Sequence, residues 1–505
     1  MMKKNILNTP NSWSNAKFPL LFDKISITNK KVKQKDYEIS GNYPIIDQGE
    51  KFIGGYTNDK SKLIINKNKI IVFGDHTKNV KLINRDFAPG ADGIKVLKTI
   101  SAIEVELYKL FIEVAACKIP SKGYSRHFQY LEKFKFPLPP LPEQHEIVRR
   151  LESQFSRLDD ATEKLKTARQ QLKTYRQAVL KQAFDGKLTE AWREQQSDLE
   201  PAETLLEKIK AERQNRYEQE LKTWKQAVKT WEKAGKTGKK TQKPQKPKTV
   251  PELTEEERKD LPALPKGWMW VKHQNFSEIN KKPDFFKIYD ELDVSFLKMA
   301  KVEELSGKIH LDETRNFGDV KKGYTPFVNN DLIFAKITPC MENGKFAVVN
   351  KLKNNIGFGS TEFHVSRFLT QFSSPNFFFY YFIQSRFRRL AQRNMTGSAG
   401  QLRVPTNYFR KVPLPMCSLK EQQQIVHEIE KRFSVAEKLE KSIEDSLQKA
   451  EALRQSILKK AFEGELTRQW REENPELISG ENSAEKLLER IKEEKEKMNK
   501  KHYEI

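Results

Sequence analysis

The chain has 505 residues, too many for a single hydrophobic core, so three or four structural units are expected. Charged residues make up 32% of it and its formal net charge is +24, which favours a polyanion such as DNA or RNA as partner. The three cysteines have neither disulfide nor metal-ligand spacing, which argues against a disulfide-rich secreted protein or a metal-binding one. The chain starts without an apolar signal segment, and its longest apolar run, FFFYYFI (377–383), is too short to span a membrane. A cytoplasmic protein is therefore expected.

Residues 1–136 mix short β-type runs with turn residues. KLIINKNKIIVFGDHT (62–77) predicts strands that end in a turn, and APGADGIKVLK (88–98) predicts a Gly-centred turn and a further strand. An apolar helix is expected over IEVELYKLFIEVAA (103–116). We interpret this region as a first globular domain.

Residues 137–199 begin with a proline-rich strap, FPLPPLPEQ (136–144), which cannot be helical and which leads into a long helix. Apolar residues recur there every seven positions, which predicts a coiled coil. The repeating positions are Leu151, Leu158, Leu165, Leu172 and Val179, with Phe155, Ala161, Ala168 and Tyr175 between them. In the motif that follows, AFDGKLTEAWRE (183–194), Gly186 is expected to end the helix.

Residues 200–262 hold a charged helical stretch and the lysine- and proline-rich sequence GKTGKKTQKPQKPK (235–248), which is expected to be unfolded. We interpret the whole segment as a tether that lets the chain begin a second half. Contact between its lysines and DNA phosphates is the less favoured alternative.

The chain then repeats itself. Residues 263–412 show the same order of elements, with DLIFAKITPCMENGKFAVV (331–349), GFGSTEFHVSR (357–367) and an aromatic helix over PNFFFYYFIQSRFRRLA (375–391). Residues 413–474 bring a second strap and long helix, and AFEGELTRQWRE (461–472) matches the first copy of the motif at eight of 12 positions, 278 residues downstream. Residues 475–505 form a charged C-terminal helix, in which SAEKLLERIK (483–492) matches PAETLLEKIK (201–210).

The second long helix has its own seven-residue repeat, with the smaller residue Ala at two positions. The repeat comprises Ile429, Ala436, Ile443, Ala450 and Ile457, with Phe433, Leu439 and Leu453 between them. Because each helix has a narrow apolar seam that needs a cover, we expect the two to pack on each other over roughly 60 Å.

No motif makes a convincing active site. GKT (235–237) lacks the first glycine of a phosphate-binding loop, and GFG (357–359) lacks the third glycine of a dinucleotide loop. Pro283–Asp284 with Asp319–Val320–Lys321 imitates a nuclease set, but such a set is common by chance in a chain rich in Asp and Lys. No amino-methyltransferase tetrad is present.

Two loops at equivalent places suit the basic charge better. SKGYSRHFQY (121–130) and RNMTGSAGQLR (393–403) lie between the aromatic helix and the strap of each copy, and each offers glycine, hydrogen-bonding side chains and an arginine. Arginine pairs with guanine and glutamine with adenine, while lysine holds phosphates. The predicted DNA-binding residues are His76, Lys78, Lys122, Tyr124, Arg126, Lys336, Thr338, Lys345, Ser398, Gln401 and Arg403. For any one of them, a solvated loop side chain is the alternative.

PLPPLPEQ, followed by a long helix that ends in AFDGKLTEAWRE, present twice and alternating with two divergent domains, closely resembles the specificity subunit of type I restriction–modification systems. LPKGWMWVKH (264–273) is similar to that family as well. The resemblance covers nearly the whole chain, and it is specific in the strap, helix and AF(D/E)G motifs but weak in the globular domains.

The resemblance implies an α+β fold with a pseudo-twofold internal repeat. Two α/β target recognition domains would each read one half of a bipartite double-stranded DNA target. Two long helices would pair as an antiparallel coiled coil and fix the unread spacer; a parallel pair would crowd both domains at one end. The chain itself would be non-catalytic and hold no cofactor. Two methyltransferase subunits would use S-adenosylmethionine to modify adenine, and restriction subunits that need ATP and Mg²⁺ would join them.

The repeated twelve residues lack a cluster of basic side chains but keep the same apolar ones. We predict from this that they bind a partner subunit, through Phe184, Leu188, Trp192, Phe462, Leu466 and Trp470. A cap on the chain's own coiled coil is the alternative. For the whole chain, a stand-alone restriction or modification enzyme and a coiled-coil scaffold without DNA reading remain the other two classes.

Overall fold

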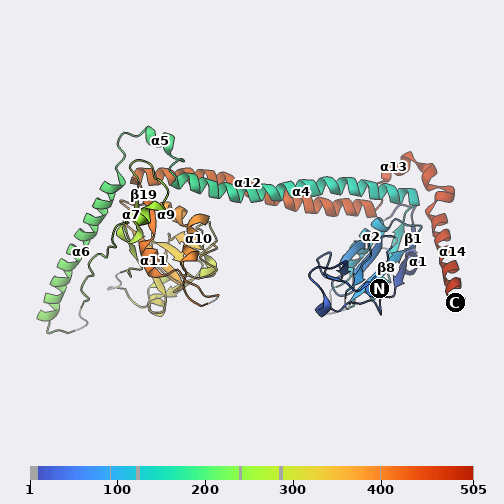
Figure 1. Cartoon of the computed structure of the whole chain (residues 1–505), viewed down its shortest axis with the longest axis horizontal. Helices are drawn as coiled ribbons and strands as arrows, with labels where there is room; N and C mark the ends of the chain where they lie inside the picture. Colours follow the sequence, from blue (N-terminus) through green and yellow to red (C-terminus); the bar gives the residue numbers. More distant parts are fainter. Residues whose placement is uncertain are drawn as a thin grey trace. The chain divides into compact units, whose positions relative to one another are not determined.

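The computed structural model describes residues 9–66, 68–90, 93–120, 126–237, 241–283, 288–398 and 400–503 (Figure 1). The chain forms two compact units. Unit 1 combines Met1–Lys166 with Glu444–Ile505, and unit 2 is Thr167–Ile443. Each unit therefore contains one globular domain together with helical segments from both copies of the repeat.

The globular domain of unit 1, called globe 1 here, is built on three antiparallel or mixed sheets. Their strand orders are β1 (Ser14–Lys17)-β9 (Lys135–Leu138), β2 (Phe22–Ile25)-β8 (Ile94–Thr99)-β5 (Ile70–Gly74)-β6 (Val80–Ile83), and β4 (Gly55–Thr57)-β3 (Tyr43–Ile46)-β7 (Ala88–Pro89). Its helices are α1 (Phe18–Leu21), η1 (Gln34–Asp36), η2 (Lys60–Lys62), α2 (Val105–Lys118) and α3 (Phe128–Leu131).

The globular domain of unit 2, globe 2, has the same plan. Its sheets are β10 (Met269–Lys272)-β19 (Pro413–Met416), β11 (Ser277–Ile279)-β18 (Phe363–Phe368)-β15 (Leu332–Ala335)-β16 (Phe346–Val348), and β13 (Thr314–Asn316)-β12 (Asp293–Leu297)-β17 (Ile356–Gly359)-β14 (Thr325–Val328). Its helices are η3 (His273–Asn275), η4 (Met299–Lys301), α8 (Phe317–Val320), η5 (Lys353–Asn355), α9 (Pro375–Phe382), α10 (Ser385–Arg393) and α11 (Thr406–Lys411).

The two globes share one topology. In both globes the order of one four-stranded sheet is the second strand, the last strand but one, and then a hairpin, which gives β2-β8-β5-β6 and β11-β18-β15-β16. The remaining sheet has a parallel pair in each, β3·β7 in globe 1 and β12·β17 in globe 2. Globe 2 adds β14 at the edge of that sheet. The predicted common order of elements is thus confirmed at the level of strand pairing, although the sequences of the globes differ.

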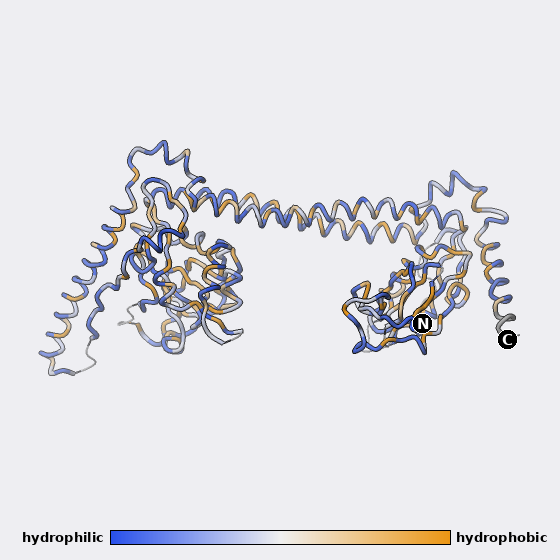
Figure 2. Tube along the Cα trace, in the orientation of Figure 1, coloured by the Kyte–Doolittle hydropathy of each residue, from blue (hydrophilic) through white to orange (hydrophobic). Residues whose placement is uncertain are grey.

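Aromatic side chains fill both cores, which appear as hydrophobic colour inside the globes in Figure 2. Tyr108 and Phe136 are fully buried in globe 1, and Phe334 stacks on Phe346 in globe 2, with 4.1 Å between ring centroids. The single aromatic helix predicted over 375–391 is wrong: it is two helices, α9 and α10, because Gln384 has an extended backbone (ψ 136°). The new helix start is satisfied by Gln177, whose side-chain oxygen accepts from the Ser385 N–H at 2.8 Å.

The long helices are α4 (Leu141–Phe184) and α12 (Leu419–Phe462). The expectation that the whole strap 136–144 is non-helical is wrong for 141–144, because a proline such as Pro142 is tolerated in the first turn of a helix. Within unit 1 the first half of α4 packs on the second half of α12, and within unit 2 the second half of α4 packs on the first half of α12, so the pair is antiparallel in both.

Half of the ten predicted seven-residue positions are buried, namely Leu151, Val179, Ile429, Ala436 and Ile457. The other half are half-buried, namely Leu158, Leu165, Leu172, Ile443 and Ala450, so the prediction is confirmed in full only near the ends of the paired helices.

The intervening seam positions were partly mispredicted. Tyr175 is 43% exposed, Leu439 and Leu453 are 51% exposed, and Ala161 is exposed too. Seven-residue steps from Phe155 and Phe433 lead mostly to polar or charged side chains, with Leu447 as the one apolar residue among them: Thr162, Arg169, Arg176, Glu440, Leu447 and Arg454. The aliphatic part of an arginine can pack in the seam while its guanidinium stays in water. In unit 2 Arg176 pairs with Glu440 at 3.0 Å, and in unit 1 Arg454 pairs with Asp159 at 2.8 Å.

A buried glutamate stands at the start of each long helix and holds the end of the other. In unit 1 Glu143 accepts from Trp13 Nε1 (2.8 Å), Thr467 Oγ1 (2.7 Å) and Arg471. In unit 2 Glu421 accepts from Trp268 Nε1 (2.8 Å), Thr189 Oγ1 (2.9 Å) and Arg193 Nε (2.8 Å). We call these two clusters the glutamate joints. In each of them the glutamate that follows a strap contacts both the tryptophan at the start of a globe and the repeated twelve-residue motif.

Both motif glycines end their helices as predicted. Gly186 and Gly464 each have φ of +71°, and a Cβ there would lie 2.1 Å from Pro265 Cγ or 2.4 Å from Pro10 Cγ respectively. Only glycine suits both the left-handed backbone and the close approach.

The remaining helices follow the motifs: α5 (Glu190–Glu194), α6 (Ala202–Lys233) and α7 (Glu255–Lys259) in unit 2, and α13 (Arg468–Glu473), η6 (Pro475–Ile478), η7 (Gly480–Asn482) and α14 (Ala484–Tyr503) in unit 1. α6 and α14 occupy matching places, with Leu205 and Ile209 buried against globe 2 and Leu487 and Ile491 buried against globe 1. Among the described residues no helix has the length and apolarity needed to cross a membrane.

The glutamate joint of unit 2 leads to a stability prediction. Glu421→Ala leaves Trp268 Nε1 and the Arg193 guanidinium without their shared acceptor in a site where Glu421 is 2% exposed. We expect a loss of about 3–5 kcal/mol in free energy of unfolding, measured by urea denaturation of the full chain.

Gln423→Ala, on the exposed side of the same turn, is the matched control and should change stability by less than about 0.5 kcal/mol. Equal effects of the two substitutions would show that the joint does not stabilise the unit.

Candidate nucleic-acid interface

The predicted DNA-binding residues belong to two turns at the ends of matching strands and to the loops that precede the straps. In globe 1 the turn after β5 begins at Asp75, whose N–H donates to Gly93 O and whose carbonyl accepts from the His127 N–H at 2.9 Å. In globe 2 the turn after β15 begins at Lys336, whose N–H donates to Glu362 O and whose carbonyl accepts from the Val404 N–H at 2.8 Å. The same backbone bonds tie each turn to the loop that precedes the strap.

This correspondence puts Arg126 and Arg403 in the same place, because each directly precedes the residue bonded to the turn. The Arg126 side chain is exposed and that of Arg403 is 40% exposed. Arginine thus stands at an equivalent position in two globes that share little sequence.

Arg403 is oriented by a carboxylate. Its Nε and Nη2 donate to Glu362 at 2.9–3.2 Å, and Nη1 donates to Gln401 O at 3.0 Å. The hydrogen bonds that Arg403 donates to Glu362 raise the pKa of the guanidinium, which keeps it positively charged. A guanidinium held in a fixed plane is suited to bidentate pairing with a base or phosphate.

The other predicted residues of globe 2 lie around this arginine. Thr338 joins the turn to the loop by a backbone bond to Leu402 O (3.0 Å), and its hydroxyl accepts from the Leu402 N–H at 3.1 Å. Ser398 and Gln401 are exposed on the loop. Lys345 is half-buried, and its N–H donates to Cys340 O where the chain returns from the turn to β16.

In globe 1 the structure brings His76 and Lys78 to the same turn. The His76 N–H donates to Gln48 Oε1 at 3.2 Å, and Lys78 Nζ donates to Ile119 O at 2.8 Å, just before the loop that carries Arg126. Lys122 and Tyr124 lie outside the described residues.

Three arginines that the sequence analysis missed precede the loop of globe 2. Arg386, Arg389 and Arg393 are exposed on α10, and spacings of three and four residues place them on one helical face. The run SRFRRLAQR could have indicated this face, but it was assigned to the end of an aromatic helix.

Two buried histidines support the loop of globe 2 from behind. His364 Nε2 lies 2.9 Å from Val404 O and Nδ1 lies 3.1 Å from Asn280 Nδ2, and its ring stacks on Phe409. His273 lies against the edge of the same Phe409 ring. Burial lowers the pKa of His273 to about 3 and that of His364 to about 4, so both are neutral near pH 7.

The predicted partner-binding residues divide into two groups. Phe184 and Phe462 are 5% and 1% exposed and contact core rings, Phe377 and Phe111 respectively, so their assignment to a partner surface is wrong. Leu188 and Leu466 pack partly against the cores, whereas Trp192 and Trp470 are only half-buried.

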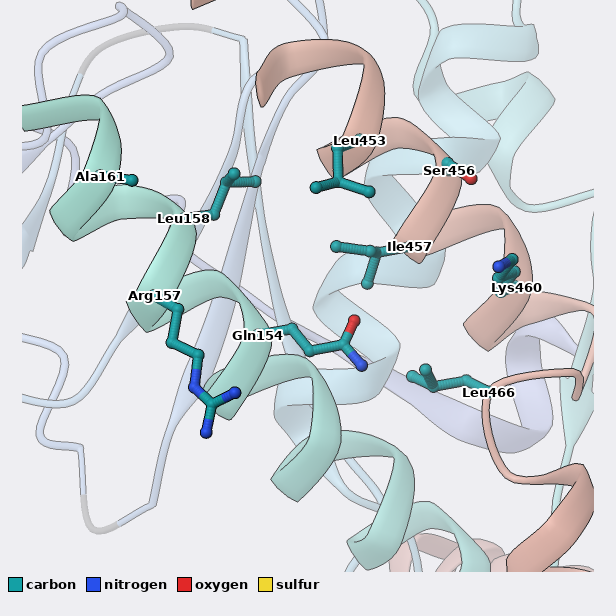
Figure 3. A pocket seen from close by; sticks show the side chains of 9 residues that line it. All are labelled: Gln154, Arg157, Leu158, Ala161, Leu453, Ser456, Ile457, Lys460 and Leu466. Carbon is teal, nitrogen blue, oxygen red and sulfur yellow. The ribbon is translucent and has the colours of Figure 1, made fainter. Parts of the chain in front are cut away.

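Leu466 also lines an open groove between α4 and α12 in unit 1 (Figure 3). The groove has a volume of about 530 Å³ and its walls are Gln154, Arg157, Leu158, Ala161, Leu453, Ser456, Ile457, Lys460 and Leu466. Its apolar side chains face one another across the two helices, with a basic residue on each side. Offset by 278 residues, unit 2 exposes Tyr175 and Leu439 at the positions of Leu453 and Ala161.

The described members of the nuclease-like set do not pair with one another. Lys321 Nζ is bound by both carboxylate oxygens of Asp290, at 2.6 and 2.7 Å, and Asp284 lies outside the described residues. In the described part of the chain no cluster of three His, Cys, Asp or Glu side chains could hold a metal ion.

Comparison with known proteins gives a consistent answer. The family model for the type I restriction modification DNA specificity domain matches residues 17–173 and 265–449. The specificity subunit of type I restriction enzyme EcoAI of Escherichia coli is 38% identical over 214 residues, which cover 42% of this chain and 36% of that relative. The EcoDI specificity subunit of Escherichia coli is 26% identical over 383 residues, 75% of this chain and 74% of the relative.

The match to the EcoAI subunit thus spans about a third of that relative's length. In fold, the chain is similar to a solved structure from work on the "structural basis underlying complex assembly and conformational transition of the type I R-M system". The TM-score is 0.58 at 15% identity, and the match covers 90% of this chain and 99% of that chain.

The buried histidines predict a pH dependence. In the unfolded chain a histidine takes up a proton below about pH 6.5, but folded His364 stays neutral until about pH 4. The folded state therefore binds fewer protons, and stability falls as pH decreases from about 6.5 towards 4, by about 1.4 kcal/mol per pH unit for each such histidine. Urea denaturation of His364→Gln between pH 7 and 5 should show a shallower loss than the parent chain.

His427→Gln, at an exposed position on α12, is the control and should follow the parent profile. If His364→Gln also followed it, protonation of His364 would not be what destabilises the unit.

Proposed function

The chain belongs to the type I restriction-modification DNA specificity family, and on that premise we propose that it reads double-stranded DNA for a restriction–modification complex. Each globe reads one half of a bipartite target. The observation that carries this proposal is the pair of equivalent loops, which end in Arg126 and Arg403 at the same backbone position of two globes with one topology and different surfaces. Two globes that share one fold but carry different surface residues can each recognise a different half-target.

Base reading and phosphate contact fall to different side chains in this proposal. Arg403, held flat by Glu362, and Gln401 reach base edges, and Arg126 does so in globe 1. Lys336, Lys345 and the α10 arginines hold phosphates, as His76 and Lys78 do beside globe 1's loop. The net charge of +24 supports such a division, because phosphate contacts supply most sequence-independent affinity.

The paired helices set the unread spacer between the two half-targets. Support for this role comes from the seam, where Arg176–Glu440 and Arg454–Asp159 pin the register of α4 and α12 within each unit. The glutamate joints fasten each globe to the helix end beside it. Helix length is then converted into a preferred separation along the DNA.

Catalysis belongs to partner subunits. We propose two methyltransferase subunits that use S-adenosylmethionine and, in the full complex, restriction subunits that use ATP and Mg²⁺. The half-buried Trp192 and Trp470, one in each copy of the repeated motif, provide two equivalent docking points, and the apolar groove beside Leu466 extends the surface of unit 1. Two equivalent surfaces suit two identical partners.

The reading proposal predicts separable effects of two substitutions. Selection of bound duplexes from a random library should return a bipartite target for the parent complex. Arg403→Ala should weaken preference at a position in one half, and Arg126→Ala at a position in the other half, each by about 1–3 kcal/mol.

Arg258→Ala, exposed on α7, is the control and should leave both halves unchanged. If either loop substitution altered both halves together, the assignment of one half to each globe would be wrong.

The docking proposal predicts a stepwise loss of partners. Trp192→Ala should lose one methyltransferase subunit and Trp192→Ala with Trp470→Ala both, because truncation of a tryptophan anchor typically weakens binding by 2 kcal/mol or more. Native mass spectrometry of the co-expressed complex counts the subunits directly.

Tyr289→Ala, at an 80% exposed position on globe 2, controls for loss of a surface aromatic. Retention of both partners by the double variant, or unfolding of that variant when it is purified alone, would make the motif structural instead.

A further inference from the structure

Beyond the part of α6 that docks on globe 2, the described residues 222–237 and 241–248 form a strongly basic arm. They contain eight lysines and one glutamate, a net charge of +7, so 24 of the 505 residues carry more than a quarter of the net +24. The stretch from 241 to 262 that returns beside α6 is largely hydrophilic in Figure 2. Neither the reading loops nor the docking motif uses these residues.

The arm is held in place at its base and along its length. Arg213 is buried and donates to Gln274 O and Asn275 O in globe 2, both at 3.0 Å, and to Lys248 O at 3.2 Å. Farther out, Trp224 Nε1 donates to Thr241 O at 2.9 Å. The described residues 241–248 form neither helix nor strand, as expected for the predicted tether, but these two bonds hold both ends of the stretch to α6.

The lysines of α6 form a stripe. Lys222, Lys225, Lys229 and Lys233 follow one another at spacings of three and four residues, which places them on one face of the helix, and all four are exposed. In the described part of the arm no lysine forms an ion pair. Like charges at this spacing repel each other, so the stripe lowers helix stability until an anion neutralises it.

A second helix of the same chain serves as an internal comparison. α14 docks on globe 1 as α6 docks on globe 2, with Lys495 bound to Asp23 at 2.6 Å where α6 has Arg213. The matching part of α6, residues 202–221, has four basic and five acidic residues, so the docking function needs no positive excess. The excess begins where the correspondence with α14 ends.

We propose that the basic arm binds the phosphate backbone of duplex DNA next to the half-target of globe 2, without reading bases. The helical stripe from Lys222 to Lys233 covers about 17 Å, which matches about five successive phosphates of one strand. Lysine is suited to this contact as a mobile point charge without directional base preference. The inference rests on the proposed function only in taking duplex DNA as the polyanion.

The test measures how DNA affinity depends on salt. Fluorescence anisotropy with the full chain and a duplex that lacks the selected target gives log K against log [NaCl]. For the variant Lys225→Gln, Lys229→Gln and Lys233→Gln, the magnitude of the slope should fall by about 2–3, since each lost phosphate contact removes about 0.9. The target selected from a random library should stay the same.

The matched control removes three exposed lysines from α14: Lys486→Gln, Lys492→Gln and Lys497→Gln. Its slope should change by less than about 1. Equal slope changes in the two triple variants would overturn the proposal, because net charge alone would then explain them. An unchanged slope for the arm variant, or loss of a partner subunit from the complex without a slope change, would overturn it as well.

Failure of the proposed function looks different. A parent chain that binds all duplexes equally would refute sequence reading, yet the arm variant could still lower the slope. A parent chain that selects a target while the arm variant leaves the slope intact refutes only the arm.

Discussion

The buried glutamate at the start of each long helix is the contact on which the rest of the structure depends. Glu143 and Glu421 each accept from an indole N–H of the segment that opens a globe and from a threonine and an arginine of one copy of the repeated motif. Each of these carboxylates is almost fully buried, and a buried charge without hydrogen-bond donors is strongly destabilising. The folded state therefore requires strap, globe and motif to come together at the glutamate. Because the motif arginine and threonine come from one copy and the glutamate from the other, each unit is completed only by residues far apart in sequence.

That exchange explains why the twelve-residue motif is repeated so closely. Gly186 must pass Pro265 and Gly464 must pass Pro10 at distances that exclude a Cβ, while Phe184 and Phe462 fill the globe cores beneath them. The retained residues of the motif are mostly accounted for by this packing. Trp192 and Trp470 are the exception, since they are half-buried and join neither core. Their repetition is the feature on which the proposed binding of partner subunits rests.

The proposed DNA reading also depends on contacts between segments that are distant in the sequence. Backbone bonds fix the turn after β5 or β15 to the loop before the strap, so the place of Arg126 and Arg403 is determined by the fold while their neighbours vary. In globe 2 the Arg403 side chain is held by its hydrogen bonds to Glu362, and the backbone of the next residue, Val404, is contacted by the buried, neutral His364. A rigid support with a variable surface is consistent with the proposal that each globe reads its own half-target.

The sequence by itself determined the repeat, the two straps, the long helices with their glycine ends, and the order of elements in both globes, because prolines, glycines and heptads act locally. It also placed Arg126 and Arg403 in equivalent loops. Only the tertiary structure decided which seam residues are buried: Tyr175, Leu439 and Leu453 are exposed because Arg176 and Arg454 pair across the helices instead. The same holds for the break between α9 and α10, where Gln177 accepts from the Ser385 N–H just after Gln384. It also holds for Phe184 and Phe462, which pack in the cores, and for Arg213, which donates to a backbone carbonyl of the basic arm. Each of these depends on a partner distant in sequence, which no local pattern contains.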